Sequence, residues 1–427
     1  MTGWVLLILV CILTYTGCQR NGSGATGTLI APLPGILVTP ADTPENSPEV
    51  WEQLRREEIL DLFREHVYGR VPETEAEVCF LEAVPESEML EGNAIRKEVD
   101  MVVSREGDTL IMGLLLFLPA ERTGPVPVFL GLNFYGNHTV HPDTDIRITG
   151  SWVMNNEEIG ITENRATSGS RGGKSGRWPV EKILSRGYGL ATMCYCDIDP
   201  DFDDGFRNGV HAILGPEPAL RDSADWGSIA AWAWGLSVAM DYLETDPDVD
   251  AGRVAVAGHS RLGKAALWAG AQDERFSLVI SNNSGCGGAA LSRRAYGERV
   301  TDINTTFPHW FAKRFHAYNG NERALPVDQH MLLALIAPRP LYVASAENDA
   351  WADPRGEYLS LYHAGRVYAL YGEKTMSDTT LPATDQPVWT GKMGYHIRSG
   401  DHDLTLFDWE QYLDFADLHF TKKQQPS

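Results

Sequence analysis

Runs of strand length that are apolar at nearly every position most constrain the fold of this chain. Residues 126–132, 254–257 and 341–344 are examples. A strand with one solvated face alternates apolar and polar residues, whereas a strand covered on both faces does not. These runs therefore predict a parallel sheet between two layers of helices. The expected strands are residues 110–118, 126–132, 188–197, 254–257, 278–281, 341–344 and 367–371.

Helical patterns separate several of these strands. Apolar side chains from Ile229 to Leu243 recur at helical spacing, and Asp246-Pro247 ends that helix before the next strand. A last helix is expected over residues 407–420. The alternation predicts an α/β fold, a three-layer sandwich with a mostly parallel central sheet. A chain of 427 residues could form about two or three domains, but we expect residues 46–427 to form one.

The charge balance excludes some classes of partner. The chain has 36 Lys and Arg against 58 Asp and Glu, so its formal net charge is −22. Most of such a surface repels phosphates, which argues against nucleic acid and against anionic membrane surfaces. Hydrophobic residues make up 43% of the chain, enough to fill a large core.

The N-terminus resembles an export signal. Residues 4–13 are apolar, a run too short to span a membrane but typical of a signal core. Small residues then lead to Cys18, as in the lipobox of bacterial lipoproteins, where that cysteine carries lipid. No Lys or Arg precedes the run and Tyr15 replaces the usual aliphatic residue, so ordinary cleavage is the alternative. We expect residues 1–18 to be a signal peptide, residues 19–45 a flexible tether, and the protein secreted, periplasmic or an outer-membrane lipoprotein.

Four cysteines follow Cys18, and we expect them to be mostly buried thiols. Two of them lie on one face of the expected strand 188–197, where a bond between them would be strained. The four are Cys79, Cys194, Cys196 and Cys286.

Two further motifs are interpreted as surface loops. Residues 168–175 nearly spell a phosphate-binding loop, but Ser168 occupies a required glycine position and no apolar strand precedes it. His138 and His141 lack an acidic or thiol companion at metal-binding spacing, so we expect a solvated loop and no metal site.

Ser260 stands where a buried strand is expected to turn sharply into a helix. Residues 254–257 form the strand, and a glycine-histidine pair precedes the serine. This is the context of the nucleophile elbow of α/β-hydrolases, in which the serine hydroxyl projects above the sheet beside an oxyanion site. The usual motif is Gly-x-Ser-x-Gly, whereas here Leu262 holds the last glycine position and Gly263 follows it. We predict that Ser260 is a nucleophile; a helix-capping serine is the alternative.

A serine nucleophile needs a base and an acid that orients it, and in α/β-hydrolases the acid precedes the histidine in sequence. Asp349 follows the strand at 341–344, and His402 lies in a loop before the last helix. We therefore predict Asp349 as the acid and His402 as the base. Glu347, at the same strand end, is the alternative acid. His396 is the alternative base, but its neighbours favour a buried or strand-edge position.

The serine motif also carries a family resemblance. Gly-His-Ser-Arg-Leu-Gly-Lys at 258–264, with Asn-Ser-Gly-Cys-Gly-Gly at 283–288, resembles the bacterial glucuronoyl esterases, carbohydrate esterase family 15. The similarity runs from about residue 50 to 420, and it includes residues 307–311, 325–330 and 337–340. The resemblance implies cleavage of the ester between (4-O-methyl-)glucuronic acid of glucuronoxylan and lignin alcohols. We expect no cofactor and a monomer.

The resemblance also implies roles for individual residues. Ser260 would be the nucleophile and His402 the base, and Arg261 would stabilise the oxyanion through its amide and guanidinium. Three residues would contact the sugar: Lys264, Glu298 and Trp351.

One position departs from the fungal pattern of this family. Fungal members place a catalytic glutamate directly before the Ser-Gly of the second motif, and here Asn283 stands there. An amide cannot supply the negative charge that supports an imidazolium. The acid must come from elsewhere, and Asp349 resembles the position that some bacterial members use.

The expected reaction is ester hydrolysis through an acyl-enzyme on Ser260. Two other functions remain open at this point. An acetyl or feruloyl xylan esterase would use the same triad without needing Lys264 and Glu298 near it. A non-catalytic carbohydrate-binding protein on the same fold would need no triad.

Overall fold

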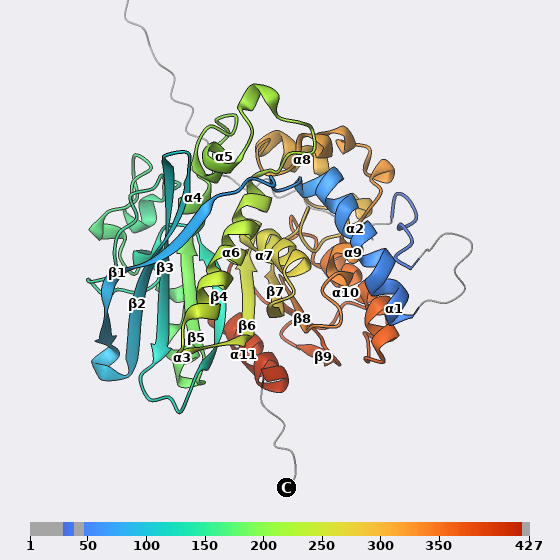
Figure 1. Cartoon of the computed structure of the whole chain (residues 1–427). Coiled ribbons are helices and arrows are strands. Elements are labelled where there is room, and N and C mark those ends of the chain that lie inside the picture. The colour runs from blue at the N-terminus through green and yellow to red at the C-terminus, as the bar shows by residue number, and fades with distance from the viewer. Residues whose placement is uncertain (1–28, 38–46, 421–427) are drawn as a thin grey trace, which may run out of the picture.

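One ten-stranded sheet runs through the computed structural model, which describes residues 29–37 and 47–420 (Figure 1). The strand order is β1-β2-β3-β5-β4-β6-β7-β8-β10-β9. The six strands from β5 to β10 in this order are parallel, and β1 to β3 and β9 are antiparallel additions at the two edges. The strands are β1 Glu77–Met89, β2 Ala94–Arg105, β3 Asp108–Pro119, β4 Val126–Asn133, β5 Gly189–Cys194, β6 Val249–His259, β7 Phe276–Asn282, β8 Leu341–Ala346, β9 Val388–Thr390 and β10 Met393–Arg398.

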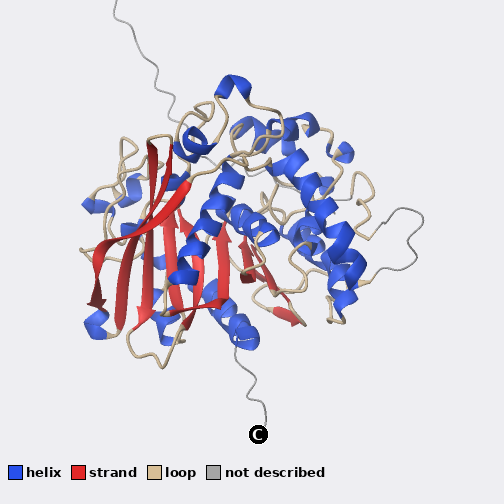
Figure 2. Cartoon of the chain, viewed as in Figure 1, coloured by secondary structure: helices blue, strands red, loops and turns tan. Residues whose placement is uncertain are grey.

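Helices surround the sheet, as Figure 2 shows. Alternate residues of β4 belong to different cores: Leu130 packs with α6 and α7, whereas Phe129 packs with α3 and α11. The sheet is thus covered on both faces, and the fold is a three-layer α/β sandwich, as the apolar runs predict. The helices are α1 Pro48–Val50, α2 Arg56–Phe63, α3 Val180–Ser185, α4 Tyr195–Ile198, α5 Gly209–Leu214, α6 Ser228–Thr245, α7 Arg261–Gln272, α8 Val300–Thr306, α9 Gln329–Ala334, α10 Pro354–Tyr368 and α11 Leu406–Phe420.

Two expected strands are wrong in whole or in part. Residues 367–371 are the end of α10 and a following 3₁₀ turn, because a short apolar run cannot distinguish a buried helix from a strand. The expected strand 188–197 ends at Cys194, where the chain turns into α4. Cys194 and Cys196 therefore do not share a strand. Both are buried free thiols, as is Cys286, whereas Cys79 is half-buried.

The N-terminal predictions fall largely outside the described residues. The leader 1–18 and the site of lipidation at Cys18 lie there, as does much of the segment 19–45. Residues 29–37 do not behave as a flexible tether, because Ile36 is buried and Arg55 donates to its carbonyl at 3.2 Å. Within the described ranges, no helix is long and apolar enough to cross a membrane.

His138 and His141 are buried, so the prediction of a solvated loop is wrong for them. His138 Nε2 lies 2.8 Å from Ser170 Oγ, and burial lowers the pKa of His138 to about 4. The neighbouring segment 168–175 contains 3₁₀ turns, and it has neither the strand nor the loop of a phosphate-binding motif. Across the residues that the structure describes, no group of three or more His, Cys, Asp or Glu side chains is arranged to hold a metal ion.

The junction of β6 and α7 is unusually close, and two glycines make it so. A Cβ on Gly258 would lie 2.1 Å from the carbonyl oxygen of Leu262, and one on Gly263 would lie 2.9 Å from that of Gly258. Position 263, and not 262, therefore requires the second glycine of the serine motif. Residue 263 is the one that faces the end of β6 and the loop after β7. Any side chain at Gly258 would force α7 away from the sheet.

We predict that Gly258→Ala lowers the free energy of unfolding by about 2–4 kcal/mol, because the added methyl group must displace the first turn of α7. Gly252→Ala is the control in the same strand, since its Cβ would meet only Asp250 Oδ1 at 3.4 Å. Urea denaturation of the two variants measures the difference. Equal stability of the two would show that the junction can relax.

Candidate active site

Ser260 adopts a strained backbone conformation at the end of β6, with φ 59° and ψ −129°. A positive φ is costly for a residue with a side chain and persists only when its surroundings impose it. Ser260 N donates to the carbonyl of Asn282 at 2.9 Å, and Ser260 O accepts from Gly263 N at 2.9 Å. The turn places the serine directly before α7, whose first N–H groups have no acceptor within the helix.

His402 and Asp349 are brought together from different loops. His402 lies between β10 and α11, and its Nδ1 donates to Asp349 Oδ2 at 2.6 Å. Burial by itself would raise the pKa of Asp349, but the hydrogen bond and charge of His402 lower it, as does the amide of Asn283, which donates at 3.0 Å. Asp349 is therefore a carboxylate that fixes the Nδ1–H tautomer of His402, leaving Nε2 to accept a proton.

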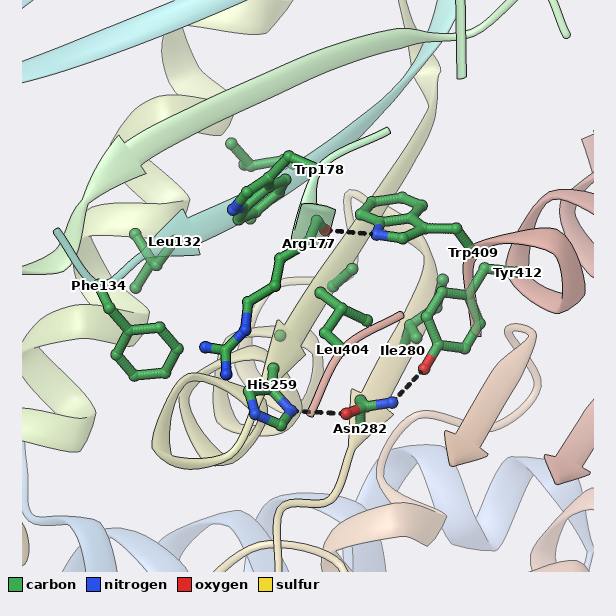
Figure 3. A pocket seen from close by; sticks show the side chains of 14 residues that line it. Leu132, Phe134, Arg177, Trp178, His259, Ile280, Asn282, Leu404, Trp409 and Tyr412 are labelled. Atoms are coloured by element: carbon green, nitrogen blue, oxygen red, sulfur yellow. Dashed lines mark hydrogen bonds between the residues drawn. The ribbon is translucent and has the colours of Figure 1, made fainter. Parts of the chain in front are cut away.

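His259 links the serine turn to His402. Its ring centroid lies 4.6 Å from that of His402, and its Nδ1 donates to Asn282 Oδ1 at 2.6 Å (Figure 3). Burial lowers the pKa of His259 well below its usual value, so the ring is neutral and does not repel a protonated His402. The predicted base thus packs on the residue that precedes Ser260.

Arg398 holds the loop that carries His402. Its guanidinium donates to the carbonyls of residues 399, 401 and 403 at 2.9, 2.8 and 2.6 Å. Arg398 is held in turn by Asp408, which is fully buried and accepts from Arg398 Nε at 3.0 Å. The position of His402 is therefore set by its neighbours on both sides.

The two alternatives for base and acid occupy other environments. His396 is buried in β10 with both ring nitrogens engaged, Nε2 by Asp408 at 2.9 Å and Nδ1 by Tyr342 at 2.9 Å. Glu347 is exposed and accepts from the Thr384 hydroxyl at 3.1 Å. Among the described residues, Asp349 is the carboxylate in contact with His402.

Two of the predicted site residues, Arg261 and Lys264, lie beside Trp310. The cationic groups of Arg261 and Lys264 lie 4.6 and 5.9 Å from its ring centroid. Lys264 Nζ donates to the carbonyl of Ser284 at 2.6 Å and lies 3.9 Å from Glu298 Oε2. Burial lowers the pKa of Lys264 and raises that of Glu298, and each partly offsets the other's shift.

Trp351 is at the surface, with 56% of its area exposed. Its carbonyl accepts from Glu298 N at 2.8 Å, and it follows Asp349 by two residues. An exposed indole therefore lies on the segment that joins the predicted acid Asp349 to a backbone contact with Glu298. A flat aromatic face beside hydrogen-bonding groups is suited to a sugar ring.

Two residues in this region were missed by the sequence analysis. Arg177 lines the same pocket as His259, and its side chain points toward Phe134 and His259 (Figure 3). Arg177 Nε donates to Asp403 Oδ1 at 2.5 Å. Asp201 forms an ion pair with Arg261. Asp201 is separated from the end of β5 by the short helix α4, and nothing in the sequence marks Arg177.

A prokaryotic relative shares most of this chain. A carbohydrate esterase, MZ0003, from an unidentified prokaryote is 50% identical over 390 residues, which are 91% of this chain and 90% of the relative. A family model described as fungal glucuronyl esterase matches residues 220–372. A solved promiscuous esterase of carbohydrate esterase family 15, from a marine bacterial metagenome, is 50% identical with a TM-score of 0.84, covering 91% of this chain and 97% of its own.

The chain belongs to carbohydrate esterase family 15, the glucuronoyl esterases. The solved glucuronoyl esterase from Solibacter usitatus is 46% identical, with a TM-score of 0.85, and covers 92% of this chain and 98% of its own. The fold is therefore the α/β-hydrolase fold. Like other members of its family, this glucuronoyl esterase is a carboxylic ester hydrolase.

Glu357 is a buried carboxyl group behind the loop that bears Asn283. It accepts from Gly285 N at 2.9 Å and from the Ser345 hydroxyl at 2.6 Å. Burial raises its pKa to about 8, against the lowering effect of these two donors. The folded esterase therefore retains a proton at neutral pH that the unfolded chain releases.

We predict that the stability of the wild type falls relative to Glu357→Gln as pH rises from about 5 to 8. A folded-state pKa above the unfolded value of about 4.3 costs stability in this window, by up to about 1.4 kcal/mol per pH unit. Urea denaturation at several pH values measures the difference. Glu347→Gln, at an exposed carboxylate, is the control; a wild-type minus Glu357→Gln difference that is constant with pH would contradict the prediction.

Proposed function

We propose that this protein is a serine esterase that hydrolyses the ester between (4-O-methyl-)glucuronic acid of glucuronoxylan and lignin alcohols. The Asp349–His402 hydrogen bond, on loops that meet the Ser260 turn, is the observation that carries the proposal. The names of the matching family model and of the Solibacter usitatus relative support the uronate ester as substrate.

The proposed reaction begins with proton transfer from Ser260 to His402 Nε2 as the hydroxyl attacks the ester carbonyl. Asp349 stabilises the imidazolium that forms. The tetrahedral oxyanion is stabilised by N–H groups at the start of α7 and by the Arg261 guanidinium. His402 then protonates the departing alcohol, and water, activated by the same histidine, hydrolyses the acyl-enzyme to release the uronic acid.

Recognition of the sugar is assigned to Lys264, Glu298 and Trp351. The ammonium of Lys264 and the carboxyl of Glu298 are near enough to serve neighbouring sugar hydroxyls, and Trp351 offers its exposed face. The uronate carboxyl is esterified in the substrate, so these groups bind a neutral sugar. An acetyl or feruloyl xylan esterase would have no use for this buried ion pair.

The protein acts, in this proposal, outside the cytoplasm as a monomer. The apolar run at 4–13 and the residues leading to Cys18 support export, and a lipid on Cys18 would anchor the mature protein to a membrane. Mass spectrometry of the mature N-terminus distinguishes a lipidated cysteine from ordinary cleavage.

We predict that the protein releases benzyl alcohol or methanol from the corresponding glucuronate esters and that Ser260→Ala reduces kcat by at least about 10⁴-fold, as loss of a triad member does. Chromatography of the released alcohol measures turnover. Release of acetate from acetylated xylan without any hydrolysis of glucuronate esters would favour the acetyl esterase. Binding of the ester without turnover would favour a carbohydrate-binding protein.

The identity of the acid is tested by a matched pair of variants. Asp349→Asn should lower kcat by about 10²–10⁴-fold, because the amide removes the charge and allows the wrong tautomer of His402. Glu347→Gln should retain activity, since this carboxylate is exposed and contacts Thr384. If steady-state assays instead show a large loss of kcat in Glu347→Gln and little change in Asp349→Asn, Glu347 is the acid.

A further inference from the structure

Asp201 is a buried carboxylate to which four side chains from other parts of the chain donate hydrogen bonds. Its side chain is only 2% exposed. Oδ1 accepts from His309 Nε2 at 2.9 Å and from Trp310 Nε1 at 2.7 Å. Oδ2 accepts from the Tyr195 hydroxyl at 2.9 Å and from Arg261 Nη1. A carboxylate is rarely buried so fully unless it is paired and hydrogen-bonded, and here both oxygens are satisfied.

The charges of this pair are fixed. Burial by itself would raise the pKa of Asp201, but the charge of Arg261 and the donors from His309 and Trp310 hold it well below its usual value. The charge of Asp201 likewise raises the pKa of Arg261 against the effect of burial. Asp201 is therefore an anion, and Arg261 a cation, at every pH at which the esterase works.

Aromatic rings leave Arg261 little freedom on its other sides. Its guanidinium lies 4.6 Å from the ring centroid of Trp310 and 5.2 Å from that of Phe307, and these two rings stack at 3.8 Å. Arg261 Nε is buried and has no hydrogen-bond partner within the described part of the chain. One edge of the guanidinium is thus held by Asp201, while a donor on the same group is left for another acceptor.

We propose that Asp201 is a positioning residue for Arg261, held in place by Tyr195, His309 and Trp310. This inference rests on the proposed function, in which Arg261 stabilises the oxyanion. An arginine side chain has several rotatable bonds, and an oxyanion donor is effective only if it is in place before the charge develops. The nearby acid Glu298 also attracts Arg261. Asp201 is the partner that makes a hydrogen bond, and it holds the guanidinium against Trp310 and Phe307.

The proposal assigns a role to a motif that the triad leaves unused. His309 and Trp310 belong to the segment 307–311, which carries part of the family resemblance. Two of its side chains donate to Asp201, and two of its rings flank Arg261. The segment therefore builds the environment of one guanidinium.

The test is the steady-state kinetics of Asp201→Asn on methyl glucuronate ester. We expect kcat to fall by about 10- to 100-fold with KM changed less than about 3-fold, because the oxyanion exists only in the transition state. Arg261→Met should lower kcat by about 10²–10³-fold. In the double variant Asp201→Asn/Arg261→Met, the loss should equal that of Arg261→Met alone, since Asp201 acts through the arginine.

Two further variants separate positioning from folding. Asp246→Asn is a matched control, because Asp246 is also buried, accepts from Lys97 at 2.9 Å and from the Tyr242 hydroxyl at 2.8 Å, and lies at the opposite end of the strands. It should lower the melting temperature and leave kcat unchanged. Tyr195→Phe removes one donor to Asp201 without changing shape, and should lower kcat by about 2- to 10-fold with a near-native melting temperature.

An aryl acetate ester serves as a second substrate, since it forms the same oxyanion without the sugar. Hydrolysis of the aryl acetate but not of glucuronate esters by the wild type would reject the proposed substrate. In that case, the kcat of Asp201→Asn on the aryl acetate decides the role of Asp201. Unchanged kcat in Asp201→Asn, or losses that multiply in the double variant, would overturn the role of Asp201. Unchanged kcat in Arg261→Met, or no hydrolysis of either ester by the wild type, would overturn it together with the oxyanion site.

Discussion

Asn282, the last residue of β7, joins the two halves of the active site. Its carbonyl accepts from Ser260 N at 2.9 Å, and its Oδ1 accepts from His259 at 2.6 Å. Its side-chain amide donates to Asp408 at 3.0 Å, and Asp408 in turn holds the arginine that clamps the His402 loop. One residue therefore couples, through its backbone and its side chain, the strained serine turn to the loop of the predicted base. Because His259 and Asp408 are buried, a change in the position of either loop would leave a polar group unsatisfied.

Paired polar and charged side chains gather at one end of the sheet in a chain whose net charge is −22. The pairs Asp349–His402, Asp201–Arg261 and Lys264–Glu298 lie close together at the carboxyl end of the parallel strands. Burying a charge is costly, so the pairs Asp201–Arg261 and Lys264–Glu298 add little to stability, but they hold donors and acceptors in fixed places. The site can thus stabilise a developing anion although the surface of the molecule carries an excess of negative charge.

The central strands of the sheet could be predicted from the sequence better than the outer strands. The parallel strands could be predicted because they are apolar on both faces, whereas β1 is half-exposed and rich in glutamate, and β10 alternates apolar and polar residues although it is buried. Ser260 and Asp349 could be found because each follows a buried strand directly. Asp201 could not be assigned a role, since its partners His309 and Trp310 are 108 and 109 residues away.

The asparagine at 283 lies directly beside the acid of the proposed triad. Its backbone has a φ of 47°, and its amide donates to Asp349 Oδ2 at 3.0 Å, the same oxygen that accepts from His402. A glutamate at 283 would place a second carboxylate beside Asp349, and two like charges at that distance would raise the pKa of one of them. An amide removes this repulsion and adds a donor that lowers the pKa of Asp349. The asparagine, which cannot supply the charge itself, therefore stabilises the charge on Asp349 in the loop after the neighbouring strand β8.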